Sequence, residues 1–170
     1  MLDSGSSYYA HLAILSQWTP YFKTNSTHNG RDLSKMKHIK LEGVDDDALL
    51  AFLVKVYPPC DLVISDANVT QLFEVAVRVD AVPLTKMCVA TLEELEPTME
   101  LAVLADKYQK ELGNLNVATI EWMAVEFDEV GNDERFNQLS KETILEVVKL
   151  SKDYGVQQEP PTKKKRFWFF

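Results

Sequence analysis

The sequence predicts an α+β fold, in which a short N-terminal sheet precedes a cluster of helices. All segments with strand character fall within residues 1–65. The rest of the chain carries apolar residues at helical spacing, with short links between five or six helices. Strands that come first and helices that follow are typical of an α+β domain, whereas a βαβ fold alternates the two.

The strand signals are short. Tyr8–Ala10 fits the end of a strand, and residues 38–42 (HIKLE) alternate apolar and polar side chains. Residues 61–65 (DLVIS) fit either a short strand or an extended link. Residues 23–37 are polar, contain Asn-Gly and show no periodicity, which predicts a loop.

Apolar periodicity and capping residues predict the helices. Asp45 is placed to cap a helix that Pro58 stops, and the acidic residues after Asp45 suit the positive end of the helix dipole. Pro83 fits a first helical position, and Pro97 opens the next helix. Val117 is expected on the apolar face of a later helix. The predicted helical segments are 11–18, 45–57, 67–80, 83–95, 97–108, 115–129 and 140–151.

Composition and charge argue against several classes of protein. The formal net charge of −8 is opposite to the basic surface of a nucleic-acid-binding protein. No apolar run reaches the roughly 18 residues that a membrane span needs, and the polar start predicts no secretory leader. Cys60 and Cys88 give no disulfide framework, so we expect reduced thiols and a cytoplasmic location, a nuclear location, or both.

No arrangement of reactive side chains predicts an enzyme. His11 has no serine, cysteine or carboxylate at a catalytic spacing, so we expect a structural histidine. The histidines and cysteines lack metal-ligand spacing, and helix capping explains the aspartates at 45–47. Cys88 falls on an apolar helical face and is expected to pack as a small hydrophobic residue. We predict no catalytic residue, metal, other cofactor or small-molecule ligand.

Three stretches, in order, resemble the BTB/POZ domain family. AHLAILSQWTPYF (10–22) is similar to the first helix-and-turn signature of that family. HIKLEGVDDDALLAFLVKVYPP (38–59) is similar to its strand and the helix that ends in tyrosine, with a Tyr-Pro-Pro variant associated with nematode members. NVTQLFEVAVRVDAVPLTKMCVATL (68–92) resembles the helix pair that follows.

The resemblance implies three parts of the chain. Residues 1–96 are expected to form a BTB/POZ-like domain that lacks most of its first hairpin, because only seven residues precede Tyr8. Residues 97–152 are similar to the helical BACK (three-box-like) extension of many cullin adaptors, as in MELAVLADKYQKEL. Residues 153–170 are expected to form a disordered basic-aromatic tail.

The resemblance also implies two contact surfaces. In the family's fold a helix at a subunit contact leads through Thr19-Pro20 into a turn with aromatic core residues. The implied dimer interface consists of His11, Leu12, Leu15, Trp18 and Tyr21. The implied cullin-facing residues are Phe22, Asn25, Thr27, Tyr57, Pro58 and Leu62.

Two departures from the family bear on these surfaces. The position after the family histidine is generally Lys or Arg and is Leu12 here, so the charged pocket of the usual dimer lacks its partners. The hydrophobic-x-Glu triplet that the resembled adaptors offer to a cullin is replaced by residues 25–27, Asn-Ser-Thr.

We therefore expect a homodimeric interaction module that is an adaptor or scaffold of a cullin-3-type ubiquitin ligase, with no nucleic-acid or membrane partner. The alternative is a dimerisation module of a transcriptional or cytoskeletal regulator that binds no cullin. The basic run Lys163, Lys164, Lys165 and Arg166 has the composition of a nuclear-import signal or an anionic-surface patch, and a solvated tail is the other interpretation.

Overall fold

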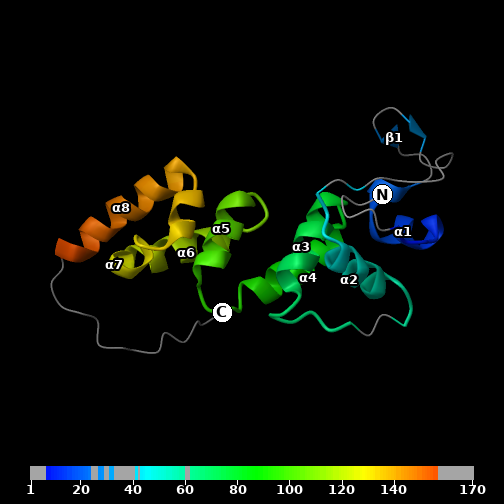
Figure 1. The fold of residues 1–170 in the computed structure, drawn as a ribbon, viewed down its shortest axis with the longest axis horizontal. Coiled ribbons are helices and arrows are strands. Elements are labelled where there is room, and N and C mark those ends of the chain that lie inside the picture. Colours follow the sequence, from blue (N-terminus) through cyan, green and yellow to red (C-terminus); the bar gives the residue numbers. More distant parts are fainter. Residues whose placement is uncertain are drawn as a thin grey trace. The chain divides into compact units, whose positions relative to one another are not determined.

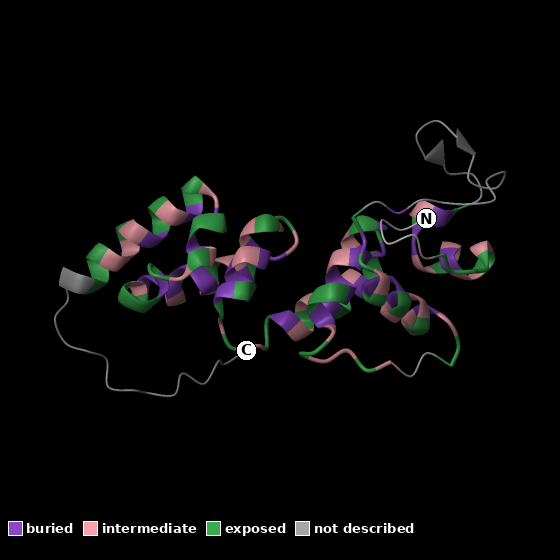
Figure 2. Ribbon diagram, viewed as in Figure 1, coloured by how far each residue is buried: buried purple, intermediate pink, exposed green. Residues whose placement is uncertain are grey.

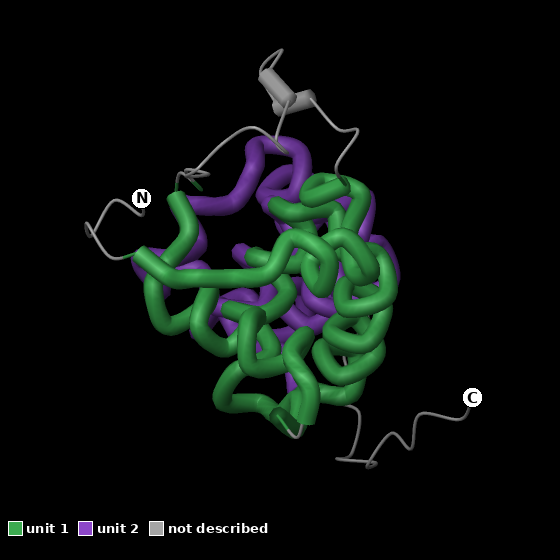
Figure 3. The backbone as a smooth tube through the Cα atoms, turned by 90° about the vertical axis from the view of Figure 1, so that its right-hand side faces the viewer, with its two compact units in different colours: residues 1–95 green, residues 96–170 purple. Residues whose placement is uncertain are grey.

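Helices make up most of the chain that the structure describes. This computed structural model describes residues 7–23, 27–28, 31–32, 41, 43–59 and 62–156. The chain divides into two compact units, residues 1–95 and 96–170 (Figure 3). The first unit contains α1 (Leu12–Trp18), the 3-10 helix η1 (Pro20–Phe22), β1 (Thr27–His28), β2 (Arg31–Asp32), α2 (Asp46–Val56), α3 (Val69–Arg78) and α4 (Val82–Leu92) (Figure 1). The second contains α5 (Met99–Lys107), α6 (Gly113–Val125), α7 (Phe127–Val130), the 3-10 helix η3 (Glu134–Gln138) and α8 (Lys141–Val156).

The predicted short N-terminal sheet is not seen. Tyr8–Ala10 and residues 62–65 form no strand, and residues 38–40 and 42 lie outside the described part of the chain. Within that part the only strands are β1 and β2, which form a minimal antiparallel pair inside the stretch predicted as a loop. A strand exists only where a neighbour completes its hydrogen-bond ladder, and alternating residues cannot supply that neighbour by themselves. The predicted cluster of helices is therefore confirmed, and the prediction of a short N-terminal sheet is corrected.

The core of the first unit lies between α2, α3 and α4. Helix α3 packs against both α2 and α4, and α1 packs against α2 and α4. Each large apolar side chain that is fully buried in this core stabilises the fold by roughly 1.5–3 kcal/mol. Cys88 packs in this core with no exposed surface, as predicted, and burial raises the pKa of its thiol to about 11 against the opposing charge of Lys55. The largest fully buried side chains of this unit are Phe52, Phe73, Leu72, Leu84, Leu92, Val69, Val75 and Val79.

Local hydrogen bonds set the ends of these helices. The Asp45 carboxylate accepts the N–H groups of Asp47 (2.9 Å) and Ala48 (3.2 Å), which confirms the predicted cap of α2. At the end of α3 the N–H of Ala81 donates to the carbonyl of Ala76 (2.7 Å), and Asp80 has a positive φ of 54°. This is the left-handed turn that commonly ends a helix, and it directs the chain back into α4.

Thr19 fixes α1 and η1 to the rest of the first unit. Its side chain is only 1% exposed. The hydroxyl donates to the carbonyl of Val79 at the end of α3 and accepts the N–H of Tyr21 at the start of η1 (3.0 Å). The predicted turn that starts at Thr19-Pro20 is therefore confirmed. The bond to Val79 joins residues 60 positions apart.

We expect Thr19→Val to lower the free energy of unfolding of the first unit by about 1–3 kcal/mol, because the Val79 carbonyl would lose this partner in a buried place. Thr91→Val is the matched control, since Thr91 is half-exposed and its hydroxyl donates to the Met87 carbonyl of its own helix. Urea denaturation measures both. Equal midpoints for Thr19→Val and wild type would contradict the role given to this hydroxyl.

The second unit has its own core cluster, in which α6 packs against α5 and α8. The predicted helix 115–129 is interrupted at Glu126 (φ −95°, ψ 27°), and the chain restarts as α7, which brings Val130 into the core. Val117, predicted on the apolar face, is 58% exposed, because the buried arc of α6 lies around Ile120 and Met123 instead. The cluster consists of Met99, Ala102, Ile120, Met123, Val130, Phe136, Leu139 and Val147.

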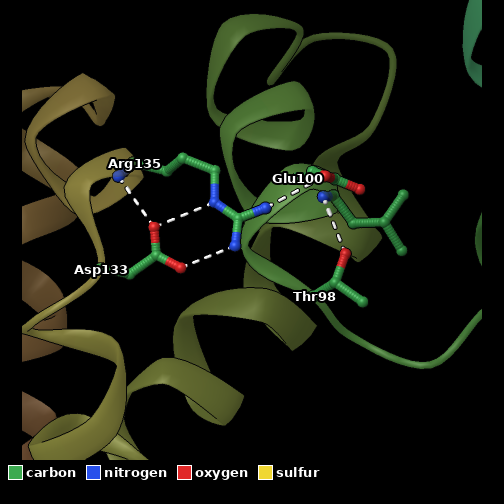
Figure 4. Close-up of polar contacts among 5 residues, drawn as sticks. Thr98, Glu100, Asp133 and Arg135 are labelled. Carbon is green, nitrogen blue, oxygen red and sulfur yellow. Dashed lines mark hydrogen bonds and ion pairs between the residues drawn. The ribbon is translucent and has the colours of Figure 1, made fainter.

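Polar contacts near the surface join η3 to the start of α5 (Figure 4). Arg135 donates to both carboxylate oxygens of Asp133 (2.9 and 2.6 Å) and to Glu100 (3.1 Å). These hydrogen bonds from Arg135 lower the pKa of Asp133 to about 2. Thr98 caps α5 by accepting the N–H of Leu101 (3.2 Å), so this helix begins after Pro97 rather than at it.

Asp106 of α5 holds the beginning of α8. Its carboxylate accepts the N–H (2.7 Å) and the hydroxyl (2.8 Å) of Ser140, and also the hydroxyl of Thr143, whose side chain is buried. Burial by itself would raise the pKa of Asp106, but the hydrogen bonds from Thr143, Ser140 and Gln109 outweigh it and the pKa is lowered. The ionised carboxylate is therefore the form that fixes α8 to α5.

We expect Asp106→Asn to destabilise the second unit by about 1–3 kcal/mol at neutral pH, since an amide cannot accept all of these hydrogen bonds. Because the pKa of Asp106 is lower when folded, its contribution is complete above the unfolded pKa of about 4 and fades as the pH falls through the folded value. Thermal unfolding from pH 7 to pH 2 should therefore show a smaller loss for Asp106→Asn than for wild type. Parallel pH curves would contradict this assignment.

Candidate interaction surface

The residues predicted for the dimer interface lie along α1 and η1. His11 is exposed, and Leu12, Trp18 and Tyr21 are partly buried. Leu15 is only 7% exposed and packs inside its own unit. The surface that this segment offers to a partner is therefore formed by its half-exposed side chains and not by Leu15.

Two tyrosines extend this surface before α1. Tyr9 is fully exposed and Tyr8 is 39% exposed. Both rings are large, rigid apolar groups that contribute much contact area to an interface at a low cost in side-chain entropy. Together with Leu12 and Trp18 they define the α1 surface.

The structure brings one residue of each predicted surface together. The Tyr57 hydroxyl accepts the backbone N–H of His11 and lies 3.2 Å from its Nδ1. The two rings are tilted, with centroids 5.9 Å apart. This contact joins the start of α1 to the end of α2. Within the part of the chain that the structure describes, His11 therefore has a structural role.

The residues predicted to face a cullin are dispersed. Phe22 is only 4% exposed and belongs to the core of its unit, and Pro58 is exposed just after α2. Leu62 is half-buried, and its carbonyl accepts Lys55 Nζ (2.8 Å), which holds the segment 62–65 against α2. Asn25 lies outside the described residues, and of Thr27 only the backbone in β1 is described.

A second apolar surface was missed by the sequence reasoning. Leu50 and Val54 on α2 are 45% and 47% exposed and lie away from the core of the first unit. Val63, in the segment 62–65 that follows α2, is 74% exposed. Figure 2 shows α2 with buried residues on one side and exposed residues on the other. The sequence did contain the signal, because these two apolar residues, one helical turn apart, fall outside the face predicted to enter the core. Helical spacing predicts that this face consists of Val44, Ala48, Leu49, Phe52, Leu53, Val56 and Tyr57. We call Leu50, Val54 and Val63 the α2 outer face.

The remaining chemistry of the described residues is limited. No group of three or more histidine, cysteine, aspartate or glutamate side chains among them is arranged to hold a metal ion. None of the helices in that part combines the length and apolar character that crossing a bilayer requires. Burial raises the pKa of Tyr21, and the nearby charge of Arg78 opposes this shift. The basic run 163–166 lies outside the described residues.

Comparison with known proteins identifies the family to which the sequence is related. The BTB/POZ domain family model matches residues 1–96. Human Kelch-like protein 41 is 28% identical over 139 residues, which is 81% of this chain and 23% of that protein. Human Kelch repeat and BTB domain-containing protein 8 is 26% identical over 162 residues, which is 93% of this chain and 26% of that protein.

The helical cluster of the first unit and the match over more than half of the sequence define the class of protein. The chain belongs to the BTB/POZ domain family. It spans about a quarter of the length of the curated relatives that it matches. The similarity to those relatives extends past residue 96 into the second unit, since it covers more of the chain than the family match does.

Proposed function

We propose that this chain is a non-enzymatic protein-interaction module that self-associates through its first unit and links a cullin-3-type ubiquitin ligase scaffold to another protein. The observation that carries the proposal is the BTB/POZ match over residues 1–96. One relative is named for a BTB domain and kelch repeats in the same protein, which supports a role that joins two binding functions. Residues 97–152, on this proposal, are a BACK-like extension.

Self-association would use the α1 surface. It presents Tyr8, Tyr9, Leu12 and Trp18 with part of their apolar area accessible to a partner. Leu12 stands where the family generally has a positive charge, so the contact here is apolar in character. Large apolar side chains that remain exposed on a folded unit are candidates for contact with a partner.

We expect Leu12→Glu to convert a dimer into monomers in sedimentation equilibrium at tens of micromolar, because a buried leucine contributes roughly 1.5–3 kcal/mol and an unpaired carboxylate adds a desolvation cost. Gln17→Glu is the matched control, since Gln17 is exposed on the same helix. Leu15 is unsuitable for this test, because its burial means that a charge there would unfold the unit. A wild-type protein that is already monomeric would contradict self-association.

Cullin binding would depend on the α2 outer face and on the residues after α2. Asn25-Ser26-Thr27 lack both the apolar anchor and the glutamate of the family triplet. The α2 outer face offers an apolar surface within the same unit, and the exposed Pro58 adjoins α2. Removing an apolar anchor commonly costs an interface about 2 kcal/mol or more, which is some thirtyfold in affinity.

We expect Asn25→Met combined with Thr27→Glu to strengthen binding to the cullin-3 N-terminal domain by about tenfold or more in a calorimetric titration, because the pair restores the missing anchor and charge. Val54→Glu should weaken binding by a similar factor, while Gln71→Glu, an exposed position on α3, should leave it unchanged. Tight wild-type binding that the double change does not improve would refute the triplet argument.

If no variant binds a cullin, the adaptor proposal fails and the second candidate takes its place. That candidate is a dimerisation module of a transcriptional or cytoskeletal regulator, and the basic run Lys163–Arg166 favours it as a nuclear-import signal. A fluorescent fusion of the whole chain should then accumulate in the nucleus and lose this accumulation when the four basic residues are replaced by alanine. We propose a cytoplasmic location, a nuclear location, or both, because the two cysteines give no disulfide framework and the basic run has the composition of a nuclear-import signal.

A further inference from the structure

The outer side of α6 and α7 combines apolar and acidic side chains. Val117 and Val125 are 58% and 56% exposed, and Glu121 lies one helical turn from each of them. The exposed carboxylates of Glu126, Asp128 and Glu129 continue this surface around α7. We call it the α6–α7 ledge, which consists of Val117, Glu121, Val125, Glu126, Asp128 and Glu129.

The ledge has one sign of charge. Residues 112–134 contain six carboxylates and no lysine, arginine or histidine. Arg135 donates to Asp133 and Glu100, so its charge is already engaged beside the ledge. A surface of this kind complements a segment that is both basic and apolar, because such a segment neutralises the carboxylates and covers the two valines.

The chain itself contains a segment of that chemistry. Residues 163–170 read KKKRFWFF, four basic residues followed by four aromatic ones, and no other stretch of the sequence combines the two in this way. The family match ends at residue 96, so the BTB/POZ domain does not account for this segment.

The segment is attached close to the ledge. Helix α8 packs against α7, and Figure 1 shows α7 beside α8 within the second unit. Six residues, 157–162, separate the end of α8 from Lys163. Six extended residues span up to roughly 20 Å, and one turn of helix rises about 5 Å. Helix α8 has 16 residues and is about 24 Å long, so the reach of the six-residue link is comparable with the length of the helix that packs against α7.

We propose that residues 163–170 dock on the α6–α7 ledge of the same chain. The basic residues lie against Glu126, Asp128 and Glu129, and the aromatic rings cover Val125 and Val117. Docking removes exposed aromatic surface that would otherwise favour aggregation. It also occupies a surface of the second unit that a basic and apolar peptide of another protein could use.

The test compares amide NMR shifts of the full chain with those of a chain that lacks residues 157–170. We expect shift changes centred on 117–129 that do not depend on protein concentration. A fluorescent peptide of residues 157–170 should bind the shortened chain in an anisotropy titration. This binding should weaken as sodium chloride rises from 0.05 to 0.5 M, because salt screens surface charges.

Variants separate the ledge from general charge effects. Glu126→Lys with Glu129→Lys should weaken peptide binding at least tenfold, and Val125→Ser should weaken it several-fold. Glu94→Lys with Glu96→Lys makes the same charge change at exposed positions in another part of the chain and should have little effect. Thermal melts of each variant check that the fold is kept.

Three results would overturn the proposal. The first is the absence of shift changes when residues 157–170 are removed. The second is a shift pattern that appears only at high protein concentration, which would assign the ledge to a second copy. The third is binding of the full chain to phosphatidylserine vesicles through residues 163–170 with no effect of the ledge variants on the shifts, which would assign the segment to a lipid surface.

Discussion

The buried hydroxyl of Thr19 is the constraint on which the arrangement of the first unit depends. It satisfies the Val79 carbonyl at the end of α3 and the Tyr21 N–H at the start of η1 with one side chain. The packing of α1 against α2 and α4 and the bond between His11 and Tyr57 add to this attachment. The position of the α1 surface, and so of any contact made through it, follows from this pair of hydrogen bonds.

The second unit uses a charged group for the same task. Asp106 joins α5 to the first turn of α8, as Thr19 joins α1 to the end of α3, but a carboxylate holds its partners only while it is ionised. The first unit therefore has a pH-insensitive attachment and the second an acid-sensitive one.

Local chemistry was readable from the sequence, and long-range partners were not. The Asp45 cap, the turn at Thr19-Pro20 and the buried Cys88 each depend on neighbours within a few residues or on a helical face, and each was predicted correctly. The bond from Thr19 to Val79 joins residues 60 positions apart, so no local pattern could reveal it. The break at Glu126 was missed because the apolar spacing continues across it.

The same limit applies to the sites. The family resemblance correctly implied that Phe22 belongs to the core, but it placed Leu15 at the dimer interface and could not show that this side chain is buried within its own unit. The predicted sheet failed for a similar reason, since a strand needs a partner that alternation does not specify. The α2 outer face was missed because Leu50 and Val54, which lie outside the apolar face expected to form the core, were not assigned to any surface.

Helix α2 is apolar on nearly every side from Ala48 to Val56, and Lys55 is its single charged residue in that span. A helix of this composition could bury either face with similar gain, so its rotation about its own axis is weakly specified by hydrophobicity. The Lys55 ammonium, bonded to the Leu62 carbonyl, breaks that ambiguity. This lysine thus acts together with the packing of Phe52 and Val56 to fix which apolar row of α2 becomes core and which remains available to a partner.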